Sequence, residues 1–132
     1  MKRTIETIQS MKPAGEKVVA LTAYDYPTTR ILNQAEVDII LVGDTLGMVV
    51  LGYESTTSVT MDDIVHHTRA VARGNRTCLL VADLPYRSYT SIDLAIANAQ
   101  RLFEAGAEAV KLEGCHPEIT QALVEHNLPV MG

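Results

Sequence analysis

Short apolar runs that end on an acidic residue recur through the chain, and each is followed by a turn and then by helical periodicity. The runs are VVALTAYD, DIILVGD, CLLVADLP and AVKLEG, and their acids are Asp25, Asp44, Asp83 and Glu113. This alternation is typical of a parallel α/β fold, in which neighbouring strands present their carboxyl ends on one common face. Acids widely spaced in sequence would then converge in space. Convergent carboxylates repel one another unless a cation or a shared proton compensates, so the pattern predicts an enzyme site.

Length and composition fit one domain with a hydrophobic core, because 47% of the 132 residues are hydrophobic and 20% are charged. The formal net charge is −5 and Lys and Arg form no cluster, which argues against nucleic-acid binding. No run reaches the ~18 apolar residues of a membrane helix, and the first twelve residues lack the apolar core of a signal peptide. We therefore expect neither nucleic acid nor membrane as a partner, and a cytoplasmic location.

Strands and helices are expected to alternate along the chain. Apolar runs predict strands at 18–24, 38–43, 78–83, 109–113 and 128–132. Periodicity predicts a short helix at 4–11 and longer ones at 27–36, 60–74 and 90–106, with a last helix from residue 117. Residues 45–59 are expected to be an irregular loop. Five parallel strands with four helical connections fit either an open doubly wound sheet or the first half of an eight-stranded barrel, and this rhythm does not distinguish them.

Two of these helices begin at a capping-box pattern. Thr60 with Asp63, and Thr90 with Asp93, place an acid three residues after a threonine, which is typical of a helix N-terminus. The two cysteines, Cys78 and Cys115, would lie at opposite ends of neighbouring strands, so we expect free thiols.

Three strand-end acids form the candidate metal site, namely Asp44, Asp83 and Glu113. Carboxylates without paired Cys or His ligands favour a hard cation, Mg²⁺ or Mn²⁺, over zinc. Mg²⁺ commonly keeps coordination positions for water or for substrate oxygens. We interpret the fourth acid, Asp25, as a cap for the helix that begins after Pro27, because a single strand-end acid often has that role.

Lys111 lies two residues before Glu113, so both side chains lie on the same face of one strand. A lysine in a buried strand is costly unless it is paired, which favours either an ion pair with Glu113 or contact with a substrate carboxylate or oxyanion. Surrounding acids would keep the amine protonated, which argues against a Schiff base. Thr45 follows Asp44 and is either a turn cap or a donor to an anionic substrate. We interpret His116, after the strand-end Glu113, as facing solvent.

Five ordered segments cover essentially all of the chain: TAYDYP (22–27), LVGDTLGMVVLG (41–52), STTSVTMDDI (55–64), VADLPYRSY (81–89) and AVKLEG (109–114). Together they resemble the ketopantoate hydroxymethyltransferases, also called 3-methyl-2-oxobutanoate hydroxymethyltransferases. The resemblance implies a (β/α)₈ barrel of the TIM type. Residues 1–132 would be a single domain, the N-terminal half of that barrel with about its first five strands. The resemblance also implies a homodecamer.

The resemblance implies an activity in pantothenate synthesis, the transfer of a one-carbon unit from 5,10-methylenetetrahydrofolate to 3-methyl-2-oxobutanoate to give 2-dehydropantoate. It implies Mg²⁺ ligands at Asp44, Asp83 and Glu113, and oxo-acid contacts at Asp44, Thr45, Asp83 and Lys111. Mg²⁺ would stabilise an enolate of the oxo acid, and Lys111 would add positive charge. The family's catalytic base is a glutamate in the second half of the barrel, so the resemblance implies that this chain lacks it.

Two other interpretations stay open. One is a Mg²⁺-dependent lyase or mutase of the isocitrate lyase and phosphoenolpyruvate mutase type, which also uses strand-end acids and an enolate and would differ in substrate. The other is a non-catalytic half-barrel that self-associates through open strand edges and uncovered apolar faces.

Overall fold

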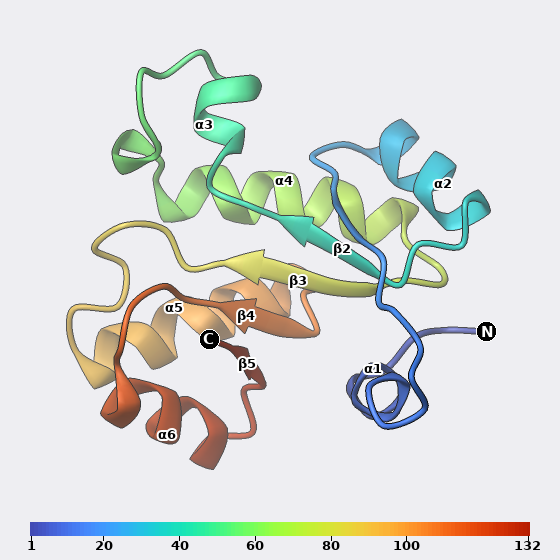
Figure 1. The fold of residues 1–132 in the computed structure, drawn as a ribbon. Coiled ribbons are helices and arrows are strands. Elements are labelled where there is room, and N and C mark those ends of the chain that lie inside the picture. Colours follow the sequence, from blue (N-terminus) through green and yellow to red (C-terminus); the bar gives the residue numbers. More distant parts are fainter.

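The computed structural model describes residues 1–132 and has one five-stranded parallel sheet surrounded by helices (Figure 1). The strands are β1 (Ala20–Thr22), β2 (Ile39–Val42), β3 (Leu79–Asp83), β4 (Ala109–Lys111) and β5 (Val130–Met131). The helices are α1 (Ile5–Met11), α2 (Tyr26–Gln34), α3 (Leu46–Val49), η1 (Thr56–Ser58), α4 (Met61–Gly74), α5 (Ile92–Glu104) and α6 (Pro117–Glu125). None of the helices combines the length and apolarity that crossing a membrane requires.

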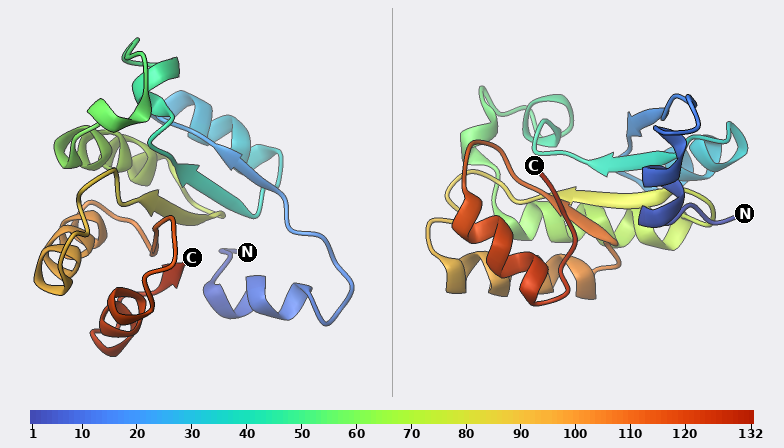
Figure 2. Two further views of the ribbon diagram at one scale, coloured as in Figure 1. Left: turned by 60° about the vertical axis from the view of Figure 1, so that its left-hand side comes forward. Right: turned by 60° about the horizontal axis from the view of Figure 1, so that its bottom comes forward.

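The order of the strands resolves the choice that the sequence rhythm left open. All pairs are parallel and the order is β1-β2-β3-β4-β5, without the reversal that a doubly wound sheet has at its switch point. Right-handed crossovers in one unbroken direction leave the connecting helices on one side of the sheet. Figure 2 shows α4, α5 and α6 on that side and α1 on the other. The chain therefore has the topology of the first part of a (β/α)₈ barrel.

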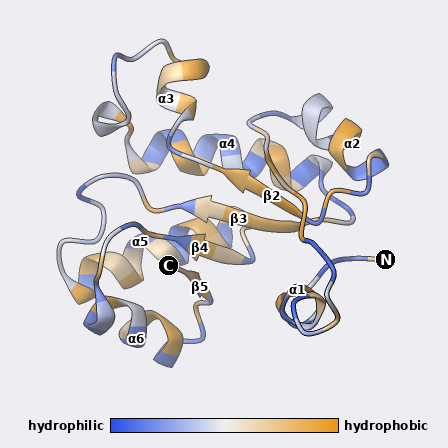
Figure 3. Ribbon diagram, viewed as in Figure 1, coloured by the Kyte–Doolittle hydropathy of each residue, from blue (hydrophilic) through white to orange (hydrophobic).

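Each buried strand alternates between two apolar layers. One set of side chains, including Ile40, Leu80 and Val110, belongs to the main core under the helices. The alternate set faces the inside of the sheet, where Ile8 of α1 packs against it. This second set consists of Ile39, Leu79, Val81 and Ala109. Because both faces of the central strands are covered, these strands are apolar along most of their length (Figure 3). The period of two then places the next inward positions of β3 and β4 at Asp83 and Lys111, where the apolar pattern stops.

Capping differs between the two long helices. The Thr60 and Asp63 capping box is present at α4, as predicted. The prediction for α5 was wrong, because Ser91 is its N-cap and accepts a hydrogen bond from the N–H of Leu94. A serine in extended conformation is as good a cap as the preceding threonine, and the pattern could not separate two adjacent hydroxyl residues.

The segment 45–59 is also more ordered than expected, since it contains α3 and η1. A Cβ placed on Gly47 would clash with Cγ2 of Val59, which shows how tightly the segment folds on itself. Val59 is buried there, so apolar packing orders a stretch whose two glycines predicted irregular structure.

Candidate active site

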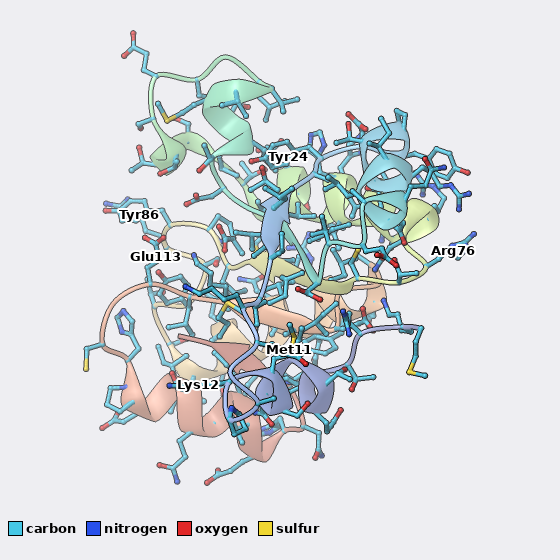
Figure 4. The ribbon with its side chains drawn as sticks, turned by 45° about the vertical axis from the view of Figure 1, so that its right-hand side comes forward. Met11, Lys12, Tyr24, Arg76, Tyr86 and Glu113 are labelled. Atoms are coloured by element: carbon cyan, nitrogen blue, oxygen red, sulfur yellow. The ribbon has the colours of Figure 1, made fainter.

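Four charged side chains line one pocket at the carboxyl ends of β2, β3 and β4. They are Asp44, Asp83, Lys111 and Glu113, and the pocket has a volume of about 100 Å³. Asp44 follows β2 by two residues, Asp83 ends β3 and Lys111 ends β4. The structure thus brings together residues up to 69 positions apart in sequence, as the strand-end pattern predicted. Figure 4 shows Glu113 and Tyr86 at the same edge of the molecule.

Lys111 holds the pocket together through two ion pairs. Its Nζ lies 3.1 Å from Oδ1 of Asp83, the residue opposite it in the register of β3 and β4, and 3.2 Å from Oε1 of Glu113. Burial acts to lower the pKa of Lys111, but the charges and hydrogen bonds of Asp83 and Glu113 outweigh it and raise this pKa above its usual value. The amine is therefore a fixed ammonium at neutral pH, which argues against its use as a covalent nucleophile.

Asp83 is the buried centre of the group, with only 7% of its side chain exposed. Its Oδ2 accepts a hydrogen bond from the backbone N–H of Asp44 at 2.9 Å, while its Oδ1 faces Lys111. The peptide after β2 is thereby tied to the end of β3. This hydrogen bond fixes the position of the Asp44 backbone, from which the Asp44 side chain extends.

Asp44 is the acid whose ionisation is opposed. Burial raises its pKa most, and the nearby charges of Asp83 and Glu113 raise it further, against the opposite effect of Lys111 and of the N–H of Thr45. Three carboxylates share one ammonium in this pocket. The pocket therefore carries excess negative charge, which a bound cation would compensate.

The donor chemistry of the pocket fits Mg²⁺, whereas the side-chain arrangement does not yet form a complete ligand set. As the side chains stand, no group of three His, Cys, Asp or Glu is arranged to hold a metal ion. The ammonium of Lys111 lies between Asp83 and Glu113 and compensates the negative charge of these two carboxylates. Glu113 is 76% exposed, so its side chain can turn without disturbing the core. Hard oxygen donors around an acidic pocket are what Mg²⁺ prefers.

The remaining candidate residues lie outside the pocket lining. Thr45 is exposed at the start of α3 and its side chain makes no capping bond. Asp25 caps α2, as predicted, since its Oδ1 accepts a hydrogen bond from the N–H of Thr28 at 2.8 Å. His116 is exposed and packs edge-to-face on Tyr89, with 5.4 Å between the ring centroids.

Sequence reasoning missed the residues that form the walls of the pocket, which are Thr56, Thr57, Leu84, Tyr86 and Tyr89. Thr56 and Thr57 belong to η1, in the connection that follows β2, and the other three lie on the loop that follows β3. Their position after strand ends was a usable signal, because loops at the carboxyl edge of a barrel carry its binding residues.

The sheet order and the charged carboxyl edge place the chain in the class of (β/α) barrels with a site at the strand ends. Two solved structures share this fold. The first is 2,3-dimethylmalate lyase, a PEP mutase/isocitrate lyase superfamily member, with a TM-score of 0.69 and 13% identity over 98% of this chain and 51% of that chain. The second is phosphonopyruvate hydrolase in complex with oxalate and Mg²⁺, with a TM-score of 0.67 and 16% identity over 81% of this chain and 37% of that chain.

Sequence similarity identifies the family within that class. The model of the ketopantoate hydroxymethyltransferase family matches residues 2–132. The 3-methyl-2-oxobutanoate hydroxymethyltransferase of Caldicellulosiruptor bescii is 51% identical over 134 residues, which cover 99% of this chain and 51% of that protein. The chain belongs to the ketopantoate hydroxymethyltransferase family, as its motifs predicted. It spans about half the length of the curated relatives it matches.

Proposed function

We propose that the protein formed by this sequence transfers a hydroxymethyl group from 5,10-methylenetetrahydrofolate to 3-methyl-2-oxobutanoate and gives 2-dehydropantoate. Family membership supports the reaction class. The observation that carries the proposal is the position of the Lys111 ammonium between Asp83 and Glu113, in the pocket that Asp44 also lines. Residues 1–132 would contribute one domain, the N-terminal half of the barrel, to a homodecamer in the cytoplasm.

Asp44, Asp83 and Glu113 are the residues that would hold Mg²⁺. When bound, the ion would supply positive charge that polarises the keto group of the oxo acid. The excess negative charge of the pocket supports a cation there, and so does phosphonopyruvate hydrolase, a protein of similar fold that holds Mg²⁺ with oxalate. Oxalate and a 2-oxo acid both present oxygens on adjacent carbons.

Lys111 would act on the substrate as a fixed positive charge. Removal of the C3 proton of 3-methyl-2-oxobutanoate develops negative charge on its keto oxygen. An ammonium already held in place by Asp83 and Glu113 stabilises such charge without reorganising during the reaction. Asp83 and Asp44 would also contact the oxo acid. Thr45 is exposed beside Asp44, so its hydroxyl is free to donate to the substrate carboxylate.

The group that accepts the C3 proton is proposed to be a glutamate in the part of the relatives that this chain does not span. Inside the pocket, Asp83 already accepts hydrogen bonds at both oxygens, and Glu113 faces Lys111. A general base must lie within hydrogen-bond reach of the proton it removes.

Replacement of the pocket residues tests this proposal. Asp83→Asn and Lys111→Met, introduced into the protein with its full coding sequence, should each lower Mg²⁺-dependent turnover of 3-methyl-2-oxobutanoate. For Lys111→Met, the expected loss of transition-state stabilisation is about 2–4 kcal/mol. Asp25→Asn is the matched control, because Asp25 is a strand-end acid that caps α2 and lies outside the pocket. Near wild-type turnover of Asp83→Asn at saturating Mg²⁺ would refute the site.

The lyase or mutase alternative has weaker support, because likeness at 13% identity concerns the fold alone. The same preparations should be supplied with a 2-methylisocitrate-like acid without folate. Cleavage of that acid, with no folate-dependent loss of 3-methyl-2-oxobutanoate, would favour the alternative.

A further inference from the structure

The loop between β3 and α5 holds an exposed aromatic ring and an exposed guanidinium together at the rim of the pocket. Tyr86 lines the pocket beside Asp83, yet it is 53% exposed. The guanidinium carbon of Arg87 lies 5.1 Å from the centre of the Tyr86 ring. Arg87 itself is exposed and is outside the pocket lining. One residue of the pair thus lines the pocket, and the other is exposed beside it.

The backbone of this loop is held in a conformation that an arginine rarely adopts. Arg87 has a φ of 63°, in the left-handed region, where a side chain other than Gly or Asn is strained. The N–H of Ser88 donates to the carbonyl of Pro85 at 3.0 Å, and the buried Asn98 of α5 donates to the carbonyl of Ser88 at 2.8 Å. These bonds clamp the strained residue. Strain that the surrounding structure maintains at a pocket rim is a mark of function.

Arg87 forms no ion pair within the chain, and its guanidinium lies over the ring of Tyr86. The ion pairs of the structure involve Lys2, Arg3, Arg101 and Lys111 as the cations. An unpaired guanidinium next to an exposed tyrosine ring matches a ligand that has an aromatic ring and a carboxylate. The small oxo acid would be held deeper, at Lys111, so the rim suits a second and longer molecule.

The geometry points to Tyr86 and Arg87 as the binding site for the outer part of the one-carbon donor, with Tyr86 stacking on its aminobenzoyl ring and Arg87 pairing with its glutamyl carboxylates. This inference rests on the proposed function, because it takes the donor to be a folate. The reactive methylene of such a donor would reach into the pocket over the oxo acid, while its carboxylate tail would leave along the rim. Tyr86 and Arg87 would be specificity residues that touch the donor and take no part in bond making.

Separate Michaelis constants for the two substrates test the assignment. Tyr86→Leu should raise the KM for methylenetetrahydrofolate by at least about fivefold relative to the KM for the oxo acid, as the loss of one aromatic stacking contact predicts. Arg87→Asn should raise the same ratio by about threefold, because an exposed ion pair is weak, and added salt should remove its effect. Tyr86→Phe keeps the ring and should behave as wild type. Arg69→Gln removes another exposed arginine, on α4, and is the control for net charge.

Direct binding provides a readout that does not depend on turnover. Calorimetry with p-aminobenzoyl-glutamate, which has the ring and the carboxylates without the pterin, should show weaker binding to Arg87→Asn than to Arg69→Gln. Asn tolerates the left-handed region, so Arg87→Asn should also melt no lower than wild type, which excludes misfolding as the cause. A donor KM within about twofold of wild type in both Tyr86→Leu and Arg87→Asn would overturn the inference. So would an equal rise in the KM of both substrates.

The inference and the proposed function fail in different ways. Exchange of the C3 proton of 3-methyl-2-oxobutanoate into D₂O needs no folate, so its absence in the wild-type protein with its full coding sequence would count against the oxo-acid site itself. Calorimetry with p-aminobenzoyl-glutamate would then still test whether Tyr86 and Arg87 bind this ligand. Exchange in the wild type together with unchanged donor affinity in the variants would overturn only the rim site.

Discussion

The acids of the pocket differ in how their negative charge is compensated. Asp83 is buried and accepts hydrogen bonds at both oxygens, and Glu113 is mostly exposed and pairs with Lys111. Asp44 is half-buried, and its pKa is raised by burial and by the other two acids. At neutral pH the fold therefore tolerates one unfavourable charge, at a position where a bound cation would make that charge favourable.

Asp44→Asn should raise the melting temperature of the chain at neutral pH in buffer with a chelator. The folded-state pKa of Asp44 lies above its unfolded value, so ionisation of this group favours the unfolded state. The advantage of Asn should be largest above the raised pKa and should disappear as pH falls below the unfolded value, near 3.8. Thermal unfolding across this range measures it. Added Mg²⁺ should stabilise wild type and leave Asp44→Asn unchanged, whereas a lower melting temperature for Asp44→Asn at neutral pH would contradict the electrostatic argument.

The two free thiols should differ strongly in reactivity. Cys115 is exposed in the loop after β4, whereas Cys78 is fully buried, and burial raises the pKa of its thiol. Because the thiolate is the reactive form, a thiol reagent at neutral pH should label Cys115 rapidly and Cys78 only as the chain unfolds. Labelling followed by mass spectrometry, with Cys115→Ser as the matched control, measures both rates. Rapid labelling in Cys115→Ser without denaturant would contradict the buried position of Cys78.

At the scale of elements, caps determine where the connecting helices begin. Thr60 and Asp63 bond to each other's backbone and side chain at the start of α4. At α5 the cap is Ser91, and Asp93 makes no capping bond. Two acids in the same sequence pattern therefore have different structural roles.

Asp63→Ala should lower the free energy of unfolding by about 1 kcal/mol, since it removes half of a capping box. Asp93→Ala is its matched control and should cost a few tenths of a kcal/mol, which is the interaction of an exposed acid with the helix dipole. Urea unfolding of both variants gives the comparison. Equal losses of unfolding free energy in the two variants would show that the helix dipole accounts for both effects. That result would contradict a stabilising role for the reciprocal capping bonds of Asp63.

At the scale of the whole molecule, the inner face of the sheet is covered at one end only. Ile5 and Ile8 of α1 pack on the inward apolar set, and Lys111 and Asp83 face the other end. At the sheet edges, β1 is exposed along its length and Met131 of β5 is 38% exposed. Exposed edges of parallel sheets favour pairing with further strands.

The 132-residue chain by itself should bind Mg²⁺ and 3-methyl-2-oxobutanoate weakly but should not exchange the C3 proton. Binding requires the acids and Lys111, which are present, whereas exchange requires a base within hydrogen-bond reach of C3. Calorimetry measures the binding, and NMR in D₂O with Mg²⁺ measures the exchange. The longer curated relatives serve as positive controls. Exchange at their rate would place the base within residues 1–132.

The sequence determined the number, order and type of the main elements, and it identified the acids at their ends. These features follow from local physics, because apolar periodicity selects strand or helix and a strand-end residue needs no long-range information to be located. Of the strand-end acids, Asp44, Asp83 and Glu113 were predicted to form one site, and they line one pocket together with Lys111, whereas Asp25 lies outside it. Five ordered motifs spread over the whole chain identified the family.

Only the tertiary structure decided how the five strands are ordered, which residues form the pocket walls and how Lys111 divides its charge between two acids. Strand order depends on whether successive right-handed crossovers continue in one direction across the sheet or reverse, which the strand and helix rhythm does not encode. The walls come from loops whose course depends on packing, such as that of Gly47 against Val59 and of Ser88 against Asn98. The pairing of Lys111 depends on the register between β3 and β4, because Asp83 lies opposite it on the neighbouring strand. Contacts between residues far apart in the chain determine these features, so a pattern of neighbouring residues cannot specify them.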